Sequence, residues 1–344
     1  MSQEIEIGLG KKGRLGYALD DVAIVPSRRT RDPEDVSTSW QIDAYEFDVP
    51  VIGAPMDSVT SPATAIAMGK MGALGVLDLE GLWTRYEDPT PLLDEIAGLP
   101  ADQATERIQQ IYAEPVKPEL ITQRLHEIRA AGVTVAGALS PQRTQQFYST
   151  VVDAGVDLFV IRGTVVSAEH VSSGQEPLNL KKFIYDLDVP VIVGGASNYT
   201  AALHLMRTGA AGVLARRDYM DESGGRYVQV IADGGMGDSG SFVKALALGA
   251  DAVMLGAPLA RATEAPGKGT HWGSEARHQT LPRGYRTTVG TVGPLEQVLF
   301  GPSHQADGKT NFIGALKRAM ASTGYVDVKN FQRCGMVVNP YSAR

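Results

Sequence analysis

Short apolar runs alternate with helical segments along most of the chain. Eight of these runs are rich in β-branched residues and lack alternation of apolar and polar positions, which indicates strands covered on both faces. Helical patterns fill the intervals, and several end in Ala-Gly or Gly-Ala before the next strand. The predicted strands span residues 49–55, 73–78, 133–139, 156–163, 189–195, 211–215, 227–235 and 252–258.

Eight β-α units in series predict a closed parallel (β/α)8 barrel, the TIM barrel, in preference to an open doubly wound sheet. Such barrels reach the length of this chain, 344 residues, when they carry insertions. We therefore expect one domain over residues 1–344.

Two regions interrupt this rhythm. Residues 79–119, after the second predicted strand, are polar, helical in pattern and punctuated by proline, so we expect a short helical insertion there. Residues 259–344 form an irregular C-terminal region rich in glycine and proline, with an amphipathic helix predicted at 311–324.

Composition excludes several classes of protein. A net charge of −7 with only short basic runs argues against a nucleic-acid partner. No apolar run approaches the roughly 20 residues of a membrane span, and the acidic N-terminus does not resemble a signal peptide. The single cysteine, Cys334, excludes an intramolecular disulfide, and we expect a cytoplasmic protein without a membrane partner.

The seventh and eighth predicted strands both end in small residues, at Asp233–Gly235 and at Gly256-Ala257. Glycines let the backbone approach a ligand closely, and barrel enzymes commonly hold a phosphate after these two strands. Ser239 then begins a helix whose free N–H groups favour an anion. Asp233 would repel phosphate and is better suited to ribose hydroxyls. The ligand stays open among a nucleotide, FMN and a sugar phosphate, and the alternative is that the glycines only make tight turns.

Other candidate residues follow strand ends. Met56 has a flexible, polarizable side chain that suits a flat ring, although it is equally typical of a core. Asp57 and Ser58 follow it at the expected catalytic face. Glu80 and Glu264 are candidate acid–base groups by position alone.

Neither histidine nor cysteine indicates further chemistry. No pair of the six histidines has a metal-ligand spacing, so we assign no metal. Cys334 has no neighbour in sequence that would activate its thiol, and we expect it to be inert.

Three stretches resemble the IMP dehydrogenase / GMP reductase family. They are YALDDVAIVPSRRT at 17–30, VPVIGAPMDSVTSPATAIAMGKMGALGVL at 49–77 and IADGGMGDSGSFVKALALGADAVMLGAPLARATEAPG at 231–267. The chain is most similar to the bacterial IMP dehydrogenase-related branch, which lacks the paired CBS regulatory domains, and the 79–119 insertion is too short for them. This resemblance implies a (β/α)8 barrel, a homotetramer or larger assembly, and a role in purine nucleotide and GMP biosynthesis.

The resemblance also implies ligands and site residues. The nucleotide is IMP, XMP or GMP, with its ribose on Asp233, its phosphate on glycines and its base near Met56. NAD is the implied cofactor, placed near Arg162, Gly163 and Thr164. The implied nucleotide-binding residues are Ala54, Met56, Asp233, Gly234, Gly235, Gly256, Ala257, Gly290 and Thr291.

In the family reaction a cysteine adds to C2 of IMP, hydride leaves to NAD, and water then releases XMP. GMP reductases run a related covalent path with NADPH and expel ammonia. The cysteine lies on a Gly-rich loop directly after the sixth strand, where a monovalent cation can also bind.

This chain departs from the family pattern at that loop. Ala215 ends the sixth predicted strand and runs directly into Arg216, which starts a predicted helix, with no loop and no cysteine between them. Either the chain has lost the loop, or a segment that contains it is missing from the sequence at this point.

Further departures affect the two ligands. Ala54 and Ala257 replace serines of the family, Ala196 replaces an asparagine, and Arg162 replaces an acidic residue that contacts NAD. The flap after the barrel is shortened to residues 301–308.

Three functions therefore stay open. The first is an IMP dehydrogenase-like oxidoreductase whose nucleophile lies on the loop expected after Ala215. The second is a purine-nucleotide-binding barrel without turnover that regulates or partners another protein. A GMP reductase is the third.

Overall fold

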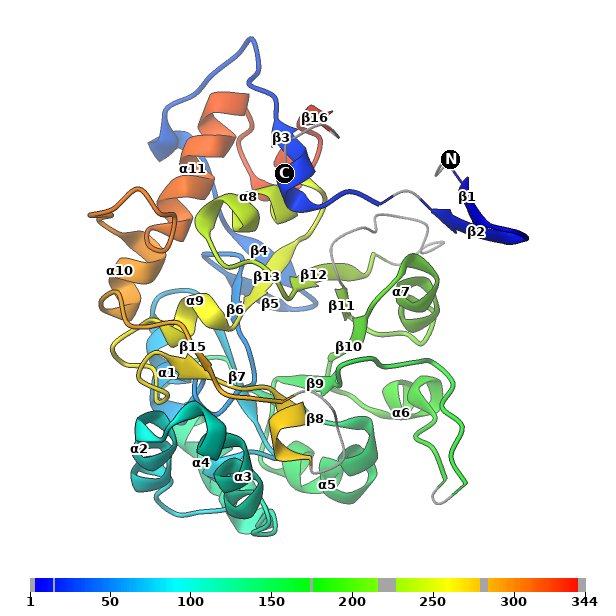
Figure 1. Cartoon of the computed structure of the whole chain (residues 1–344), viewed down its shortest axis with the longest axis vertical. Coiled ribbons are helices and arrows are strands. Elements are labelled where there is room, and N and C mark those ends of the chain that lie inside the picture. Colours follow the sequence, from blue (N-terminus) through cyan, green and yellow to red (C-terminus); the bar gives the residue numbers. More distant parts are fainter. Residues whose placement is uncertain (1–3, 15, 174–175, 216–226, 279–283, 340–344) are drawn as a thin grey trace.

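Eight parallel strands close into a barrel in a computed structural model that describes residues 4–14, 16–173, 176–215, 227–278 and 284–339. Each strand pairs with the next in the chain, and the last pairs with the first. The predicted (β/α)8 barrel is confirmed, and every predicted strand overlaps one of the eight (Figure 1). They are β6 (Val51–Gly53), β7 (Leu74–Asp78), β8 (Ala136–Leu139), β9 (Leu158–Arg162), β10 (Val191–Ala196), β11 (Gly212–Ala215), β12 (Gln229–Asp233) and β13 (Ala252–Leu255).

Apolar side chains on both faces hold the barrel together. Successive residues of a strand point to opposite faces, so one set fills the interior and the other packs against the helices. On β9, for example, Val160 belongs to the interior cluster and Ile161 to a cluster that includes helix residues. The interior cluster includes Ile52, Leu74, Val76, Ala136, Ala138, Leu158, Val160, Ile192, Leu214, Ile231, Ala252 and Met254.

A small hairpin closes the end of the barrel at which the strands begin. It consists of β4 (Trp40–Ile42) and β5 (Tyr45–Phe47), whose rings Trp40 and Phe47 stack at 5.1 Å. Both rings belong to the interior cluster, and Ile42 lies against Gly212 where β11 begins. The opposite end, where the strands finish, is therefore the face left for a site.

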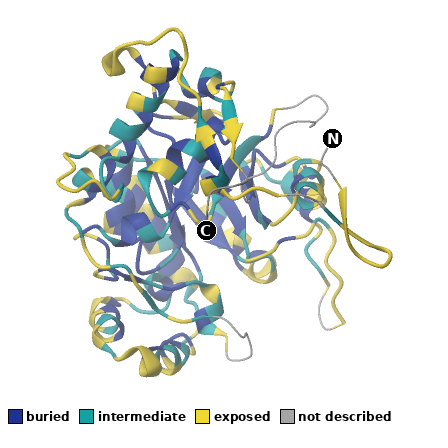
Figure 2. Ribbon diagram, turned by 45° about the horizontal axis from the view of Figure 1, so that its top comes forward, coloured by how far each residue is buried: buried dark blue, intermediate teal, exposed yellow. Residues whose placement is uncertain are grey.

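Helices surround the barrel as the pattern predicts, with buried residues gathered on the strands and exposed ones on the outer helical faces (Figure 2). The interval between β11 and β12 holds residues 216–226, so the helix predicted from Arg216 lies outside the described residues. No helix in the described ranges is long and apolar enough to span a bilayer. The surrounding helices are α1 (Pro62–Lys70), α4 (Pro118–Ala130), α5 (Pro141–Asp153), α6 (Leu180–Asp186), α7 (Tyr199–Met206) and α8 (Ser239–Ala247).

The insertion after β7 is helical, as predicted, and packs on the face where the strands end. It contains η3 (Leu82–Thr84), α2 (Thr90–Gly98) and α3 (Ala101–Ile111). Its small apolar core includes Trp272 and Ala276 from the C-terminal region, so two regions distant in sequence meet there.

The C-terminal region wraps one side of the barrel. The predicted amphipathic helix is present as α11, and its Phe312 ring lies 5.6 Å from that of Phe242 on α8. The elements of this region are α9 (Ala257–Ala260), β14 (Thr270–His271), η4 (Ser274–Arg277), β15 (Thr287–Thr288), α10 (Leu295–Phe300), α11 (Phe312–Thr323), α12 (Val328–Phe331) and β16 (Met336–Val338).

The N-terminal segment adds elements that the sequence pattern did not predict. The hairpin of β1 (Glu4–Gly8) and β2 (Lys11–Arg14) projects away from the barrel (Figure 1). After η1 (Leu19–Asp21), β3 (Val22–Ile24) pairs with β16 and so joins the N-terminal segment to the C-terminal region; η2 (Pro33–Asp35) follows.

The start of α1 offers a test of the fold. Ser61 caps this helix, because its Oγ accepts the Thr64 N–H at 3.0 Å. We expect Ser61→Ala to lower the free energy of unfolding by about 1 kcal/mol, measured by urea denaturation. Ser322→Ala is the control, because the Ser322 hydroxyl donates to a helical carbonyl on the exposed surface. This variant should change the free energy of unfolding by less than about 0.5 kcal/mol. Equal losses in both variants would contradict the capping role.

Candidate functional site

An ion pair spans the mouth of the barrel. Arg162 ends β9 and Asp233 ends β12, and Arg162 Nη2 lies 3.4 Å from Asp233 Oδ2. The two side chains are 26% and 22% exposed, and Arg162 Nε is buried with no hydrogen-bond partner among the described residues. The residue predicted for ribose and one predicted for the cofactor thus contact each other, with a donor left for a ligand.

A cavity of about 330 Å³ surrounds this pair. It brings together the three predicted cofactor residues and two of the predicted nucleotide residues. Ala215, the last residue before the expected catalytic loop, lines it as well. Thr164 Oγ1 donates to Glu275 at 3.0 Å across one wall. The lining includes Arg162, Gly163, Thr164, Ala196, Ala215, Asp233, Gly234, Ser274 and Glu275.

A second group of predicted residues meets where β13 pairs with β6. The Ala54 N–H donates to the Leu255 carbonyl at 3.0 Å. A Cβ atom placed on Gly256 would lie 3.2 Å from Met56 Sδ and 3.8 Å from the Ala54 side chain. The sulfur of Met56 therefore lies over Gly256, where a larger residue would crowd it. Ala257 begins α9 immediately afterwards.

Gly290, the neighbour of Thr291, is connected to this group through backbone hydrogen bonds. The Gly290 N–H donates to the Gly269 carbonyl at 3.0 Å, and the Gly269 N–H donates to the Ala260 carbonyl at 3.1 Å. Ala260 ends α9, which begins beside Gly256. The segment predicted to contact the base is thereby tied to α9. No described contact joins Thr291 to the ion pair.

The start of α8, where an anion site is expected, is partly occupied by acceptors of the protein itself. The helix begins at Ser239 as predicted, but the Asp238 carboxylate accepts the Ser241 N–H at 2.9 Å. The Gly308 carbonyl accepts the Ser239 N–H at 2.8 Å. These acceptors occupy the N–H groups of Ser239 and Ser241, whereas the N–H groups of Gly234, Gly235 and Gly237 in the loop before the helix have no partner among the described residues.

Asp57 lies in a buried polar cluster. It is 2% exposed, and its carboxylate accepts a hydrogen bond from the Tyr112 hydroxyl at the end of the insertion. That hydroxyl in turn accepts from Trp272 Nε1 at 3.1 Å. Beside them Arg277 Nη2 pairs with the Asp78 carboxylate at 3.1 Å. Ser58, also predicted at the catalytic face, is fully buried.

Burial changes the acidity of this cluster. It raises the pKa of Asp57 to about 7, and the negative charge of Asp78 adds to the rise. The charge of Arg277 and the hydrogen bond from Tyr112 oppose it, and burial also raises the pKa of Tyr112 well above its ordinary value. Asp57 thus connects the Met56 loop to the insertion with a carboxyl group that is difficult to ionise.

A larger cavity, about 1330 Å³, lies beside the first. Ser274 lines both, so the two cavities share one residue of their walls. Its wall includes the cations Arg85, Arg143 and Arg277, which no sequence motif had indicated. Glu80 is also on this wall, where its carboxylate accepts the Ser140 N–H.

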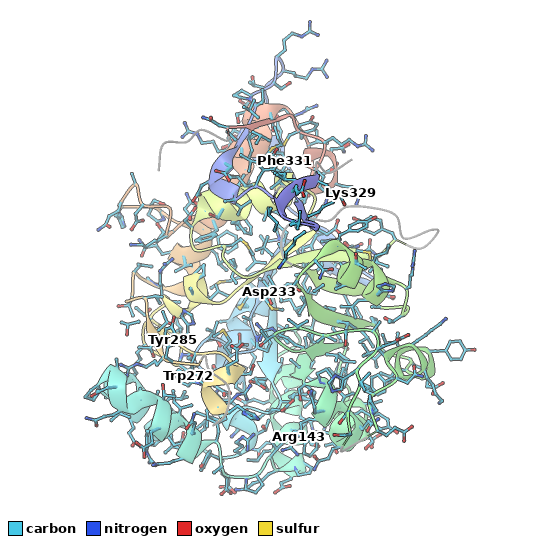
Figure 3. The ribbon with its side chains drawn as sticks, turned by 45° about the vertical axis from the view of Figure 1, so that its right-hand side comes forward. Arg143, Asp233, Trp272, Tyr285, Lys329 and Phe331 are labelled. Atoms are coloured by element: carbon cyan, nitrogen blue, oxygen red, sulfur yellow. The ribbon has the colours of Figure 1, made fainter. Side chains whose placement is uncertain are left out.

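Glu264 and Cys334 do not join the site. Glu264 accepts the Leu295 N–H at 2.8 Å, at the start of α10. Cys334 is buried, which raises its pKa, and it follows Gln332, whose amide donates to the Ala250 carbonyl just before β13 begins. Figure 3 shows Asp233 between Lys329 and Phe331, which lie near one end of the molecule, and Trp272 and Arg143, which lie toward the other.

Within the described ranges, no group of three or more His, Cys, Asp or Glu side chains is arranged to hold a metal.

Comparison with known proteins agrees with the barrel fold. A family model described as IMP dehydrogenase / GMP reductase domain matches residues 16–216 and 213–286. An uncharacterized oxidoreductase of Mycolicibacterium smegmatis is 47% identical over 97% of this chain and 99% of its own length. One from Mycobacterium tuberculosis is 46% identical with the same coverage. A crystal structure of an IMP dehydrogenase/GMP reductase-like protein from Corynebacterium glutamicum has a TM-score of 0.91 and 44% identity, and the match covers 98% of each chain.

The same comparisons bear on the missing loop. The two stretches matched by the family model meet at residues 213–216, where Ala215 runs into Arg216. The alignments with both relatives extend over 372 positions, whereas this chain has 344 residues. The relatives therefore have residues where this chain has none, and the break in the family match falls at the expected catalytic loop.

Asp57 allows a test of the buried cluster by pH. Its folded pKa exceeds its unfolded value, so the folded state binds the proton more tightly and stability contributed by this group falls as pH rises from about 4 to 7. We expect Asp57→Asn to remove this loss. The stability of the variant relative to the native protein should therefore increase from pH 5 to pH 8. Thermal unfolding at both pH values measures it.

The exposed residue Asp153 provides the control. The variant Asp153→Asn should keep the pH dependence of the native protein. If Asp57→Asn also keeps it, Asp57 is not the buried group that titrates.

Proposed function

Because the chain belongs to the IMP dehydrogenase / GMP reductase family, we propose that it is an oxidoreductase that converts IMP, NAD and water into XMP and NADH. The observation that supports this most directly is the cavity at the mouth of the barrel. Residues predicted for the nucleotide and for the cofactor line it together, from the ends of different strands.

We propose that the purine nucleotide lies across the mouth. The Asp233 carboxylate accepts hydrogen bonds from the ribose hydroxyls, and the N–H groups of the 234–237 loop face the phosphate. Met56 lies against the purine ring, above Gly256. The Asp233 carboxylate then interacts with both Arg162 and the ribose, and the unpartnered Nε of Arg162 provides a further hydrogen-bond donor for the ligand.

The larger cavity, which lies beside the first, suits NAD by size and by charge. Its volume of about 1330 Å³ exceeds that of the first cavity, and Arg85, Arg143 and Arg277 supply positive charge for a pyrophosphate. Arg162, Gly163 and Thr164 lie on the side nearer the nucleotide. NAD supplies a hydride acceptor for C2 of the purine.

The chain's own residues bind and orient the nucleotide in this proposal, but a thiol is needed to form the covalent adduct. Cys334 lies toward the amino ends of the strands, and Asp233 lies at the carboxyl ends. This arrangement favours a second candidate, a barrel that binds a purine nucleotide without turnover. In the first candidate the thiol belongs to a segment after Ala215 that the sequence lacks.

Turnover and binding separate the two candidates. Purified protein mixed with IMP and NAD should produce NADH absorbance if the oxidoreductase proposal holds, and calorimetric titration with IMP should show binding in either case. Binding without NADH would support the second candidate. NADPH oxidation with GMP would indicate a GMP reductase, and no binding of any purine nucleotide would contradict every candidate.

Asp233 is the residue whose loss should weaken nucleotide binding most directly. Asp233→Ala leaves ribose hydroxyls unpaired, and we expect IMP affinity to fall by about 1–3 kcal/mol in calorimetry. The exposed Asp102, on the insertion, gives a control for loss of one negative charge. Asp102→Ala should leave IMP affinity unchanged, and an equal loss in both variants would argue for a general electrostatic effect.

A further inference from the structure

We propose that Arg261 binds the phosphate of the nucleotide and supplies positive charge beside the 234–237 glycine loop. This inference rests on the proposed function, which places a purine nucleotide in the barrel mouth. The residues predicted from sequence to hold the phosphate are glycines and Ala257, which offer N–H groups and no charge.

The position of Arg261 brings its guanidinium to this loop. The residue directly follows α9 and keeps a helical conformation, with φ −79° and ψ −11°. Side chains on a helix lean toward its N-terminus, which here is Gly256. Arg261 Nη1 donates to the Gly237 carbonyl at 2.7 Å, so the guanidinium bridges α9 and the glycine loop.

That guanidinium has an N–H donor without an acceptor and a positive charge without a counter-ion among the described residues. Arg261 Nε is buried without a hydrogen-bond partner, and no carboxylate in the described ranges lies within ion-pair distance of it. Burial lowers the pKa of Arg261, although an arginine side chain stays protonated. A partly buried cation without a counter-ion indicates an anionic ligand.

The nearby carboxylates are committed elsewhere. Asp238 accepts from the N–H and the Oγ of Ser241, at 2.9 and 3.0 Å. Asp307 accepts from the N–H of Lys309 and pairs with its Nζ, both at 3.1 Å. Each raises the pKa of Arg261 from a distance without pairing with it.

His271 is a further basic group near Arg261. Burial lowers its pKa, and the charge of Arg261 lowers it further. His271 therefore tends to be neutral at pH 7, and Arg261 carries the positive charge of this region.

The glycine loop provides the matching half of a phosphate site. Gly234 and Gly235 have φ values of 91° and 87°, and the N–H groups of Gly234, Gly235 and Gly237 have no hydrogen-bond partner in the described structure. The space beside Gly235 and Gly237 is open to 4 Å. A phosphate needs several N–H donors together with a cation, and an arginine supplies the charge with directed donors.

Calorimetry with IMP and with inosine, which lacks the phosphate, tests the proposal. Arg261→Gln should weaken IMP binding by about 10- to 100-fold and change inosine binding by less than about twofold. Arg261→Lys, which keeps the charge, should recover part of the loss. The salt dependence of IMP affinity should also become shallower in Arg261→Gln, because one ionic contact is removed.

Arg286 offers a matched control. It too has a buried, unpartnered Nε, and its Nη1 donates to backbone carbonyls, those of Ile96 and Ala97 on α2. Arg286→Gln should therefore leave the affinity ratio of IMP to inosine and the salt dependence unchanged.

Two outcomes would overturn the proposal and remain distinguishable. If Arg261→Gln weakens IMP and inosine equally, or leaves the salt dependence unchanged, Arg261 only fastens the Gly237 carbonyl, and the proposed function survives. If the native protein binds no purine nucleotide, the proposed function fails and this inference fails with it. Thermal unfolding of each variant shows whether it is folded.

Discussion

Closure of the parallel barrel is the constraint on which the rest of the structure depends. A parallel sheet can pair β13 with β6 only by curling until its edges meet, and closure brings all eight carboxyl ends to one mouth. Residues separated by two hundred positions thereby become neighbours. Met56 lies over Gly256, and Arg162 reaches Asp233 across the mouth. The candidate site follows from this geometry rather than from any local motif.

Burial then decides which charges at the mouth are available to a ligand. Asp57 follows Met56 directly, yet its carboxyl group is enclosed by Tyr112 from the insertion, and burial favours the neutral form. Asp233 is only partly buried and has Arg162 as a counter-ion. The carboxylate of Asp233 therefore stays partly accessible at the mouth, whereas Asp57 holds the neighbouring loop against the insertion.

Sequence patterns predicted the barrel because its strands are continuous apolar runs separated by amphipathic helices, a signal that is local. They did not predict the β4–β5 hairpin, whose strands have three residues each and too little pattern to detect. Most of the nucleotide residues could be proposed from resemblance, and Asp233 from its strand end. The pairing with Arg162 spans 71 positions, and that of Tyr112 with Asp57 spans 55, so no spacing rule connects them. Arg261 resembles an ordinary surface arginine in sequence, and its contact with Gly237 and its buried, unpartnered Nε distinguish it only in the structure.

Binding and chemistry depend on different parts of this chain. The contacts proposed for the ribose, the phosphate and the base come from β6, β12, β13 and the segments just after them, all of which the structure describes. The family's covalent step needs a thiol after β11, where Ala215 precedes Arg216 and the family match breaks. Loss of that segment would remove the nucleophile without removing the ion pair, the glycine loop or Met56. A nucleotide site can therefore persist in this barrel whether or not the chain turns its ligand over, which is why binding and turnover have to be measured separately.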